Sequence, residues 1–171
     1  MAIADDFDLG RLALSGGEGR RLSLDVRMDA FAFGGERYSV APAPVRVVLD
    51  VSRLAGSGFS LRLRFRARLS GPCMRCLAEA SRVLEVDARE VDRPGEGEEL
   101  DSPYVRDEVL DLHAWAHDAL ALVLPVQILC GDECAGLCAV CGIDLNQAGP
   151  DHQHPRSPDP RWAKLSELKL R

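Results

Sequence analysis

The chain has 171 residues, of which 46% are hydrophobic, and a formal net charge of −6 at pH 7. This length fits one domain, or one domain with a small appendage, and the hydrophobic fraction allows a real core. The sequence has no run of about 18 apolar residues, which excludes a membrane-spanning helix, and its acidity argues against a protein that coats nucleic acid non-specifically. Residues 1–10 hold three aspartates and no basic residue, unlike a secretory signal, so we expect a cytoplasmic protein with reduced thiols.

Alternation of apolar and polar side chains predicts four strands. They lie at residues 21–28, 45–54, 59–69 and 82–91. The third strand has the clearest pattern, because apolar residues occupy the odd positions from Leu61 to Leu69 and arginines occupy the even positions between them. In a strand these two sets point to opposite faces of the sheet. We expect an antiparallel meander with a cysteine pair at the hairpin tip between the third and fourth strands.

A helix is predicted after the fourth strand. Residues 92–103 are acidic and rich in Gly and Pro, which is typical of a mobile loop. Apolar residues then recur at helical spacing from Leu112 to Val123, and Pro125 ends the pattern. A second loop at residues 154–159 leads to a predicted short terminal helix. The apolar stripe of that helix would consist of Trp162, Leu165 and Leu168.

Six cysteines and two histidines have the spacing of metal ligands. They form four close pairs, namely Cys73 and Cys76, Cys130 and Cys134, Cys138 and Cys141, and His152 and His154. Two residues between thiolates let both sulfurs reach one tetrahedral zinc ion at about 2.3 Å. In a reducing compartment such pairs indicate metal binding before disulfides. Eight ligands are enough for one or two structural zinc ions.

The grouping of these ligands stays open. Cys73 and Cys76 with Cys130 and Cys134 would tie the hairpin tip to the segment after the helix, and the other four ligands would form a local site near the C-terminus. The main rival is one zinc-ribbon site made by the two C-x-x-C pairs alone. Two further alternatives are buried, inert thiols and a redox dithiol at Cys73 and Cys76, which lacks the helix N-terminus that would lower a thiol pKa.

No catalytic residue is predicted. Protein side chains fill every visible zinc ligand position, which leaves no place for water or a small-molecule substrate. His113 and His117 have metal spacing on a helix, but the glutamate that H-E-x-x-H proteases use as a base is absent, so we expect both histidines to face solvent. The sequence also lacks G-x-S-x-G, a phosphate-binding glycine loop and a dinucleotide fingerprint. We therefore expect a binding protein and not an enzyme.

Together these features predict an α+β fold. Its antiparallel β-sheet, a meander or partly open barrel, would carry one main helix and a zinc-braced C-terminal segment. Residues 1–129 would form the sheet and helix. Residues 130–171 would form the zinc-binding segment, packed on the sheet as one compact unit.

The polar face of the third strand is a candidate RNA-binding surface. Its residues are Arg62, Arg64, Arg66 and Arg68. A spacing of roughly 6.6 Å suits successive backbone phosphates, and Arg75 between the first two cysteines is a further candidate. The alternative is a solvated face whose arginines pair across the sheet with acids such as Glu85 and Asp87. Few aromatic residues accompany the arginines, so base stacking is not expected.

Several motifs in the second part of the chain occur in a specific order. They are Cys73-Met-Arg-Cys76-Leu77, Leu124-Pro125, Cys130-x-x-x-Cys134-x-Gly136-Leu137-Cys138-x-x-Cys141-Gly142, Asp144-Leu145-Asn146 and Asp159-Pro160-Arg161. In these motifs, which span about the last 110 residues, the chain resembles the YceD family, named for large ribosomal RNA subunit accumulation. Many members of that family carry C-x-C where this chain has His152-x-His154, an exchange that a shared zinc ligand pair allows.

The resemblance implies a bacterial factor that large-subunit (23S) ribosomal RNA needs in order to accumulate. We predict that it binds ribosomal RNA or a pre-large-subunit particle without catalysis. One alternative is an adaptor whose acidic residues 92–111 attract a basic ribosomal protein while the Trp162 helix docks it. The charge distribution is compatible with both RNA binding and the adaptor role. Residues 53–82 hold seven arginines and one acid, whereas residues 85–111 hold eleven acids and three arginines. The other alternative is a thiol or zinc redox protein.

Overall fold

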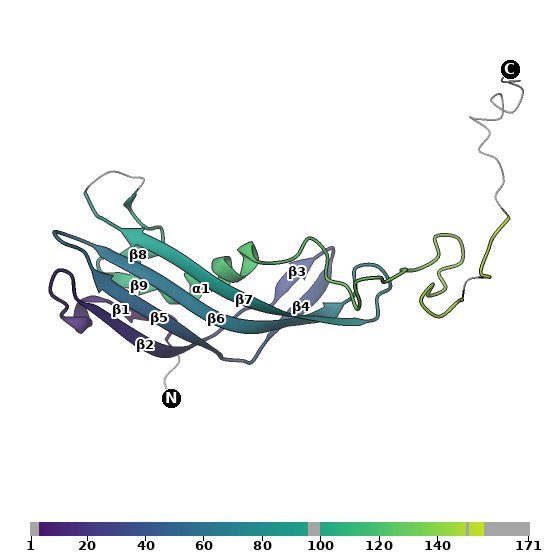
Figure 1. Ribbon diagram of the computed structural model, residues 1–171, viewed down its shortest axis with the longest axis horizontal. Coiled ribbons are helices and arrows are strands. Elements are labelled where there is room, and N and C mark those ends of the chain that lie inside the picture. The colour runs from purple at the N-terminus through teal and green to yellow at the C-terminus, as the bar shows by residue number, and fades with distance from the viewer. Residues whose placement is uncertain (1–3, 96–99, 150, 156–171) are drawn as a thin grey trace, which may run out of the picture.

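Two antiparallel sheets and one main helix make up the fold (Figure 1). The computed structural model describes residues 4–95, 100–149 and 151–155. The elements are β1 (Asp6–Asp8), the 3-10 helix η1 (Gly10–Leu12), β2 (Gly19–Val26), β3 (Phe31–Phe33), β4 (Glu36–Ala41), β5 (Val45–Arg53), β6 (Phe59–Pro72), β7 (Glu79–Asp92), β8 (Val105–Arg106), β9 (Val109–Asp111) and α1 (Leu112–Leu122). The predicted α+β class is confirmed, and within the described residues neither sheet closes into a barrel.

Strand β6 is the centre of the larger sheet because it pairs along both edges. On one side it runs antiparallel to β7 over its whole length, from Phe59 opposite Asp92 to Pro72 opposite Glu79. On the other side its first half pairs with β5 and its last part pairs with β4. Strands β2 and β3 continue the sheet beyond β5 and β4. The predicted meander, with a cysteine pair at the β6–β7 tip, is confirmed.

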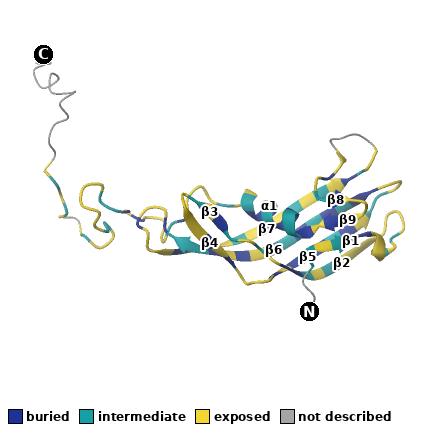
Figure 2. Ribbon diagram, turned by 180° about the vertical axis from the view of Figure 1, so that it is seen from behind, coloured by how far each residue is buried: buried dark blue, intermediate teal, exposed yellow. Residues whose placement is uncertain are grey.

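The apolar face of β6 is buried, as its alternation predicts. Helix α1 lies against the side of the main sheet to which the apolar side chains of β6 point (Figure 2). The buried side chains of β6 and those of α1 belong to one core. The buried residues of the helix are Leu112, Trp115, Ala116, Ala119 and Leu120. Asp111 caps the helix, because its side chain accepts a hydrogen bond from the backbone N–H of Ala114 at 2.8 Å. Val123, which the pattern places on the apolar stripe, lies beyond the last turn and is exposed.

The sequence patterns do not predict the five shorter strands. Three of them, β1, β9 and β8, form a separate sheet in which Phe7 lies opposite Leu110. Strands of two or three residues show too few alternations for a recognisable period. The β3–β4 hairpin does carry a signal, since Gly34 and Gly35 take positive φ values between two aromatic strands. The terminal helix expected around Trp162 lies outside the described residues. In the part of the chain that the structure describes, no helix is long and apolar enough to cross a membrane.

A close contact between Tyr38 and Gly71 joins β4 to the end of β6. Tyr38 is buried, and its hydroxyl donates a hydrogen bond to the carbonyl of Pro72 at 2.9 Å. A Cβ atom at Gly71 would lie 2.8 Å from Cε1 of Tyr38 and closer still to its Cδ1. We expect Gly71→Ala to lower the free energy of unfolding by about 1–3 kcal/mol, because the ring must move within a packed core.

Urea unfolding of the metal-loaded protein measures this difference. Gly131→Ala is the matched control, since a Cβ there meets nothing within 4 Å. Equal stability of the two variants would contradict the proposed role of the Tyr38 contact.

Candidate metal centres and the arginine face

The tip of the β6–β7 hairpin brings Cys73 and Cys76 close together. The turn is closed by hydrogen bonds from the Cys73 N–H to the carbonyl of Ala78, at 2.7 Å, and from the Leu77 N–H to the carbonyl of Cys73, at 3.0 Å. Leu77 has a φ of 62°, the left-handed conformation that reverses the chain here. Both cysteines are buried. The turn therefore presents two thiols to whatever segment covers the tip.

The segment after α1 covers this tip. Ile128 is buried, and its carbonyl accepts a hydrogen bond from the N–H of Met74 at 2.9 Å. Cys130 follows two residues later, and a turn closed by the Cys134 N–H and the carbonyl of Gly131, at 3.2 Å, brings Cys134 back to the same place. The anchoring of Ile128 thus sets the second pair of thiols over the first.

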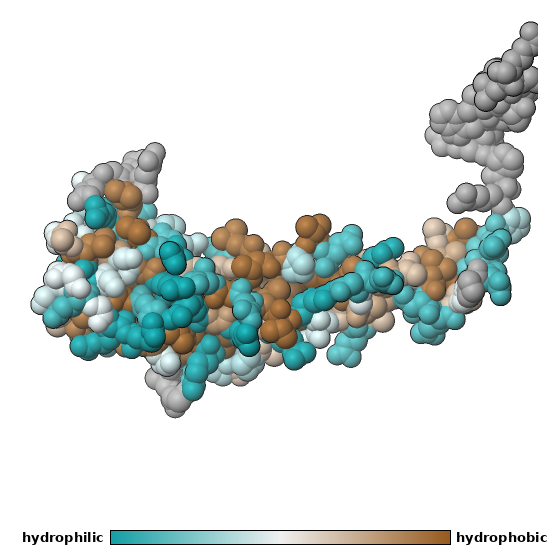
Figure 3. All heavy atoms as spheres, in the orientation of Figure 1, coloured by the Kyte–Doolittle hydropathy of each residue, from teal (hydrophilic) through white to brown (hydrophobic). Residues whose placement is uncertain are grey.

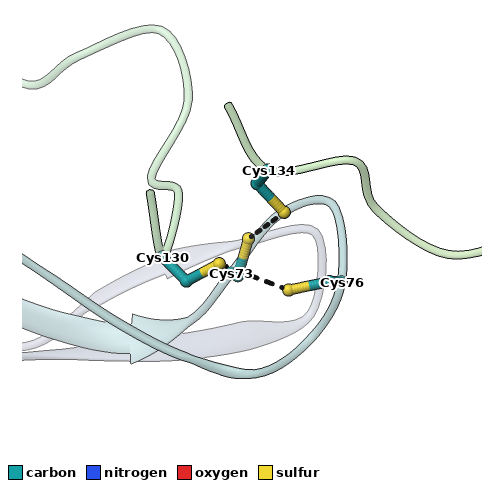
Figure 4. Close-up of side chains that lie close together, drawn as sticks. All are labelled: Cys73, Cys76, Cys130 and Cys134. Atoms are coloured by element: carbon teal, nitrogen blue, oxygen red, sulfur yellow. Dashed lines mark hydrogen bonds between the residues drawn. The ribbon is translucent and has the colours of Figure 1, made fainter. Parts of the chain in front are cut away.

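We call Cys73, Cys76, Cys130 and Cys134 the first cluster (Figure 4). The Sγ atoms of Cys73 and Cys134 are 3.7 Å apart, those of Cys76 and Cys130 are 3.5 Å apart, and all four lie within 4.8 Å of one another. A disulfide would need about 2.05 Å. Four sulfurs bound to one zinc ion at about 2.3 Å would be about 3.8 Å apart along the edges of a tetrahedron. The first cluster fits one four-coordinate metal ion.

We call Cys138, Cys141, His152 and His154 the second cluster. Sγ of Cys141 lies 3.5 Å from Nε2 of His152 and 3.3 Å from Nε2 of His154, and the two Nε2 atoms are 3.1 Å apart. The corresponding edges around a tetrahedral zinc ion would be about 3.6 Å and about 3.3 Å. Gly142, with a φ of 72°, turns the chain back after the second cysteine. This cluster also fits one metal ion.

The structure groups the eight residues into two separate sets of four. This is the first of the groupings that the sequence leaves open, and the two C-x-x-C pairs belong to different sets. His113 and His117 belong to neither: Nε2 of His113 lies 3.3 Å from a carboxylate oxygen of Asp29, and the ring of His117 stacks on Phe31 at 4.5 Å. Either cluster could hold a metal ion.

Close packing moves thiol pKa values in the first cluster in opposite directions. Burial opposes ionisation of Cys73, but hydrogen bonds from the backbone of Arg75, Cys76 and Cys130 lower the pKa of its thiol to about 6. Interactions with the thiols of Cys76 and Cys134 raise the pKa of Cys130 to about 12. One thiolate forms readily at neutral pH, whereas a further negative charge so close by needs a cation.

The second cluster is more exposed than the first. Cys141 is exposed and its other members are half-buried, whereas three members of the first cluster are buried. A hydrogen bond from the backbone of Cys141, together with the ring of His152, lowers the pKa of the Cys138 thiol to about 6. A thiolate is thus also available to a cation in this more open site.

Asn146, five residues after Cys141 of the second cluster, supports a ligand of the first cluster. Its Nδ2 donates to Sγ of Cys134 at 3.5 Å, and its Oδ1 accepts from the N–H of Ala135 at 2.8 Å. Asp144 holds the same side chain in place, since its Oδ1 accepts from Nδ2 at 2.7 Å. Hydrogen bonds of this kind orient a ligand and tune metal affinity. The sequence does not identify Asn146 as a site residue, and its one signal is the short Asp-x-Asn spacing after the second C-x-x-C pair.

The arginines of β6 lie on the face of the sheet opposite the core, and three of them are paired with acids there. The pairs are Arg62 with Asp87, Arg64 with Asp50, and Arg66 with Glu85. The Arg68 guanidinium donates a hydrogen bond to the Ser81 hydroxyl at 3.5 Å, and neither Arg68 nor Arg75 has an ion pair among the residues that the structure describes. The structure thus matches cross-strand pairing for three of the four strand arginines.

The pairs of Asp50 and Asp87 favour the ionised carboxylates. The guanidinium groups of Arg21 and Arg64 hold the pKa of Asp50 below its usual value, and Arg62 does the same for Asp87. A phosphate that approaches this face must compete with carboxylates that are already in place. Competition is weakest at the cysteine end of β6, where Arg68 and Arg75 lie.

Comparison with known proteins covers both clusters. The family described as "Large ribosomal RNA subunit accumulation protein YceD" matches residues 61–169. Uncharacterized proteins of Mycobacterium tuberculosis and Mycobacterium bovis are each 37% identical over 106 residues, which is 57% of this chain and 49% of theirs. An uncharacterized protein of Mycobacterium leprae is 42% identical over 65 residues, 38% of this chain and 29% of that protein.

The chain thus spans about half the length, or less, of these curated relatives. No solved structure matches the chain. The family match extends over most of the chain, from β6 through α1 and both clusters. The chain belongs to the YceD family of large ribosomal RNA subunit accumulation proteins.

Proposed function

We propose that the protein is a non-catalytic factor in the accumulation, processing or assembly of large-subunit (23S) ribosomal RNA in the bacterial cytoplasm. The observation that carries this proposal is the family match over residues 61–169. The protein would act by contact with ribosomal RNA or with a pre-large-subunit particle. A role without catalysis agrees with two clusters whose own side chains would fill all four positions around a metal, which leaves none for a substrate.

Both clusters, in this proposal, bind structural zinc. Thiolate and imidazole are donors that zinc prefers, and the distances in each cluster are close to tetrahedral edges. Bound zinc would supply a cross-link, while the side chains of this chain supply its geometry. Residues 1–129 would then form the sheet-and-helix domain and residues 130–171 the zinc-binding segment, which the first cluster joins to the β6–β7 tip.

The proposed RNA contacts are the arginines of β6 together with Arg75. Within this set, Arg68 and Arg75 face the least competition from carboxylates, and both are exposed. They lie near the β6–β7 tip, so the first cluster would also fix the part of the chain that carries them. The three paired arginines would contribute only where a phosphate displaces Asp87, Asp50 or Glu85.

A second candidate function is an adaptor for a basic ribosomal protein. The observation that favours it is the excess of acids in residues 85–111. The Trp162 segment that was expected to dock the partner lies outside the described residues. A redox role for Cys73 and Cys76 is less favoured, because each of these sulfurs also lies near a second partner, Cys134 at 3.7 Å and Cys130 at 3.5 Å, and the set of four is spaced for a shared cation.

The metal proposal predicts two zinc ions per chain and proton release on binding. Since the pKa of Cys130 is about 12, its thiol is protonated at pH 7.5 and must lose a proton when zinc binds at the first cluster. Calorimetric zinc titrations in two buffers of different ionisation enthalpy measure the released protons. Affinity at the first cluster should already fall as the pH is lowered from 7.5, because Cys130 must lose its proton, and affinity at both clusters should fall more steeply below about pH 6, where the Cys73 and Cys138 thiolates are also protonated.

Two variants separate the sites. Cys130→Ser and His154→Ala should each leave one zinc ion per chain. Zinc content that neither variant changes would refute the ligand assignment.

Asn146 should tune the first cluster. We expect Asn146→Leu to weaken zinc binding there by about 10- to 100-fold, because the Cys134 sulfur loses the Nδ2 donor. Competition with a chromophoric chelator measures the affinity. Gln147→Ala is the matched control, since Gln147 contacts Asp144 and no cluster ligand. Equal affinities of the two variants would show that Asn146 does not support the cluster.

Depletion of the protein tests the ribosomal role. We expect the ratio of large- to small-subunit ribosomal RNA to fall in depleted cells and to recover with the wild-type gene. The Arg68→Ser/Arg75→Ser variant should fail to restore the ratio, whereas Arg37→Ser, which changes an exposed arginine on β4, should restore it. An unchanged ratio on depletion would overturn the proposed function. Full recovery with the double variant would overturn only the arginine contacts.

A further inference from the structure

The chain between Cys130 and Pro155 projects beyond the end of the main sheet (Figure 1). Hydrophobic side chains gather on this projecting part (Figure 3). Val140, inside the second C-x-x-C pair, is 72% exposed, and Ile143 just after it is 45% exposed. Neither side chain is a ligand of the second cluster, and together they give this segment an exposed apolar surface, a feature that can mark an interaction site.

Val140 borders a cleft of about 880 Å³. Leu145 and Pro155 form its other apolar walls, and the ligands Cys138, His152 and His154 lie in the same lining. Because three of the eight lining residues are ligands of the second cluster, the shape of the cleft depends on that cluster. The volume is enough for one or two apolar side chains of another molecule.

The charge around the cleft selects the class of that molecule. Residues 130–155 contain four acids and no lysine or arginine. Asp132 pairs with Arg82, and Asp144 accepts hydrogen bonds from Asn146. The two remaining acids are Asp151, next to the cleft residue His152, and Glu133, in the loop between Cys130 and Cys134 of the first cluster; both are exposed and have no ion pair within the described residues. This surface attracts cations and repels phosphates.

We propose that the cleft and its acidic surroundings bind a segment of a partner protein in which apolar side chains are flanked by lysine or arginine. RNA is the less favoured occupant, because residues 130–155 contain no lysine or arginine and no Phe, Tyr or Trp, and the two histidine rings of the cleft are candidate metal ligands. The proposal deepens the adaptor candidate by naming a surface other than the acidic residues 92–111. It rests on a metal at the second cluster and not on the ribosomal RNA role.

Fluorescence anisotropy with the zinc-loaded full-length chain tests the proposal. The probe is a labelled 12-residue peptide in which leucines are flanked by arginines, and the comparison probes are the same peptide with glutamate for arginine and a labelled 12-nucleotide oligouridylate. We expect the arginine peptide to bind more tightly than both. Val140→Asp should weaken it about tenfold, and Glu133→Gln/Asp151→Gln should weaken it and reduce its salt dependence.

Val83→Asp is the matched control, because Val83 is 55% exposed on β7, outside the projecting segment, and its substitution should leave binding unchanged. Zinc content, measured for each variant, separates loss of the cleft from loss of the metal. The proposal is overturned if the oligouridylate binds more tightly, or if Val140→Asp retains both zinc and wild-type affinity for the peptide. It is also overturned if Trp162→Asp/Leu165→Asp tightens peptide binding tenfold or more, since residues 156–171 of the chain itself would then be the occupant. If depletion leaves the ratio of large- to small-subunit ribosomal RNA unchanged, the proposed ribosomal role fails, but the peptide-binding results still decide the proposal for the cleft.

Discussion

The meeting of four thiols at the β6–β7 tip is the constraint on which the C-terminal part of the described chain depends. Cys76 and Cys130 lie 54 positions apart, and the sulfurs of Cys73 and Cys134 meet across 61 positions. Closing so long a loop costs conformational entropy that the few backbone hydrogen bonds at the tip can offset only in part. A shared metal would hold all four side chains at once. Within the described residues, the segment that carries the second cluster is tied to the tip by the hydrogen bond of Asn146 to Cys134 and by that of the Leu137 N–H to the carbonyl of Arg75.

Strand β6 determines where the four thiols of the first cluster meet. Its apolar side chains build the core against α1, its polar side chains form the arginine face, and its end carries the first cysteine. The same register that buries Leu63 sets Arg62 and Arg64 beside carboxylates of the neighbouring strands. A change in register would move each of these sets at once, because side chains alternate strictly between the two faces. The core, the charge pattern and the position of the first cysteine pair, which follows β6 directly, therefore all depend on the register of one strand.

The charge pattern of the cysteine end differs from that of the middle of the sheet. Along the middle of the sheet, arginines and acids neutralise one another. Near the cysteine end, Arg68 and Arg75 lie without ion pairs among the described residues, and beyond them the chain turns acidic and apolar. A basic and an acidic binding surface would then lie at the same end, held together by the first cluster. Contacts with RNA and with a basic protein segment are compatible in such an arrangement, since each would use its own surface.

The sequence by itself determined the long elements and the ligand types. Alternation over ten or more residues predicted β6 and β7, and helical spacing after Asp111 predicted α1, because long periodic patterns reflect one buried face. The C-x-x-C, C-x-x-x-C and H-x-H spacings identified all eight candidate ligands, because short-range geometry decides which side chains can share an ion. These features are local, and local features can be read along the chain.

Only the tertiary structure decided which ligands meet, which arginines are paired and which acids stay free. The grouping of Cys73 with Cys134 depends on the return of the chain after α1, which the burial of Ile128 directs and no spacing encodes. The pairing of Arg64 with Asp50 instead of a phosphate follows from the register between β5 and β6. Short strands such as β1 and β9 exist only because distant segments pair. Contacts between residues far apart in the chain depend on the summed packing of the whole core, and no single stretch of sequence contains that sum.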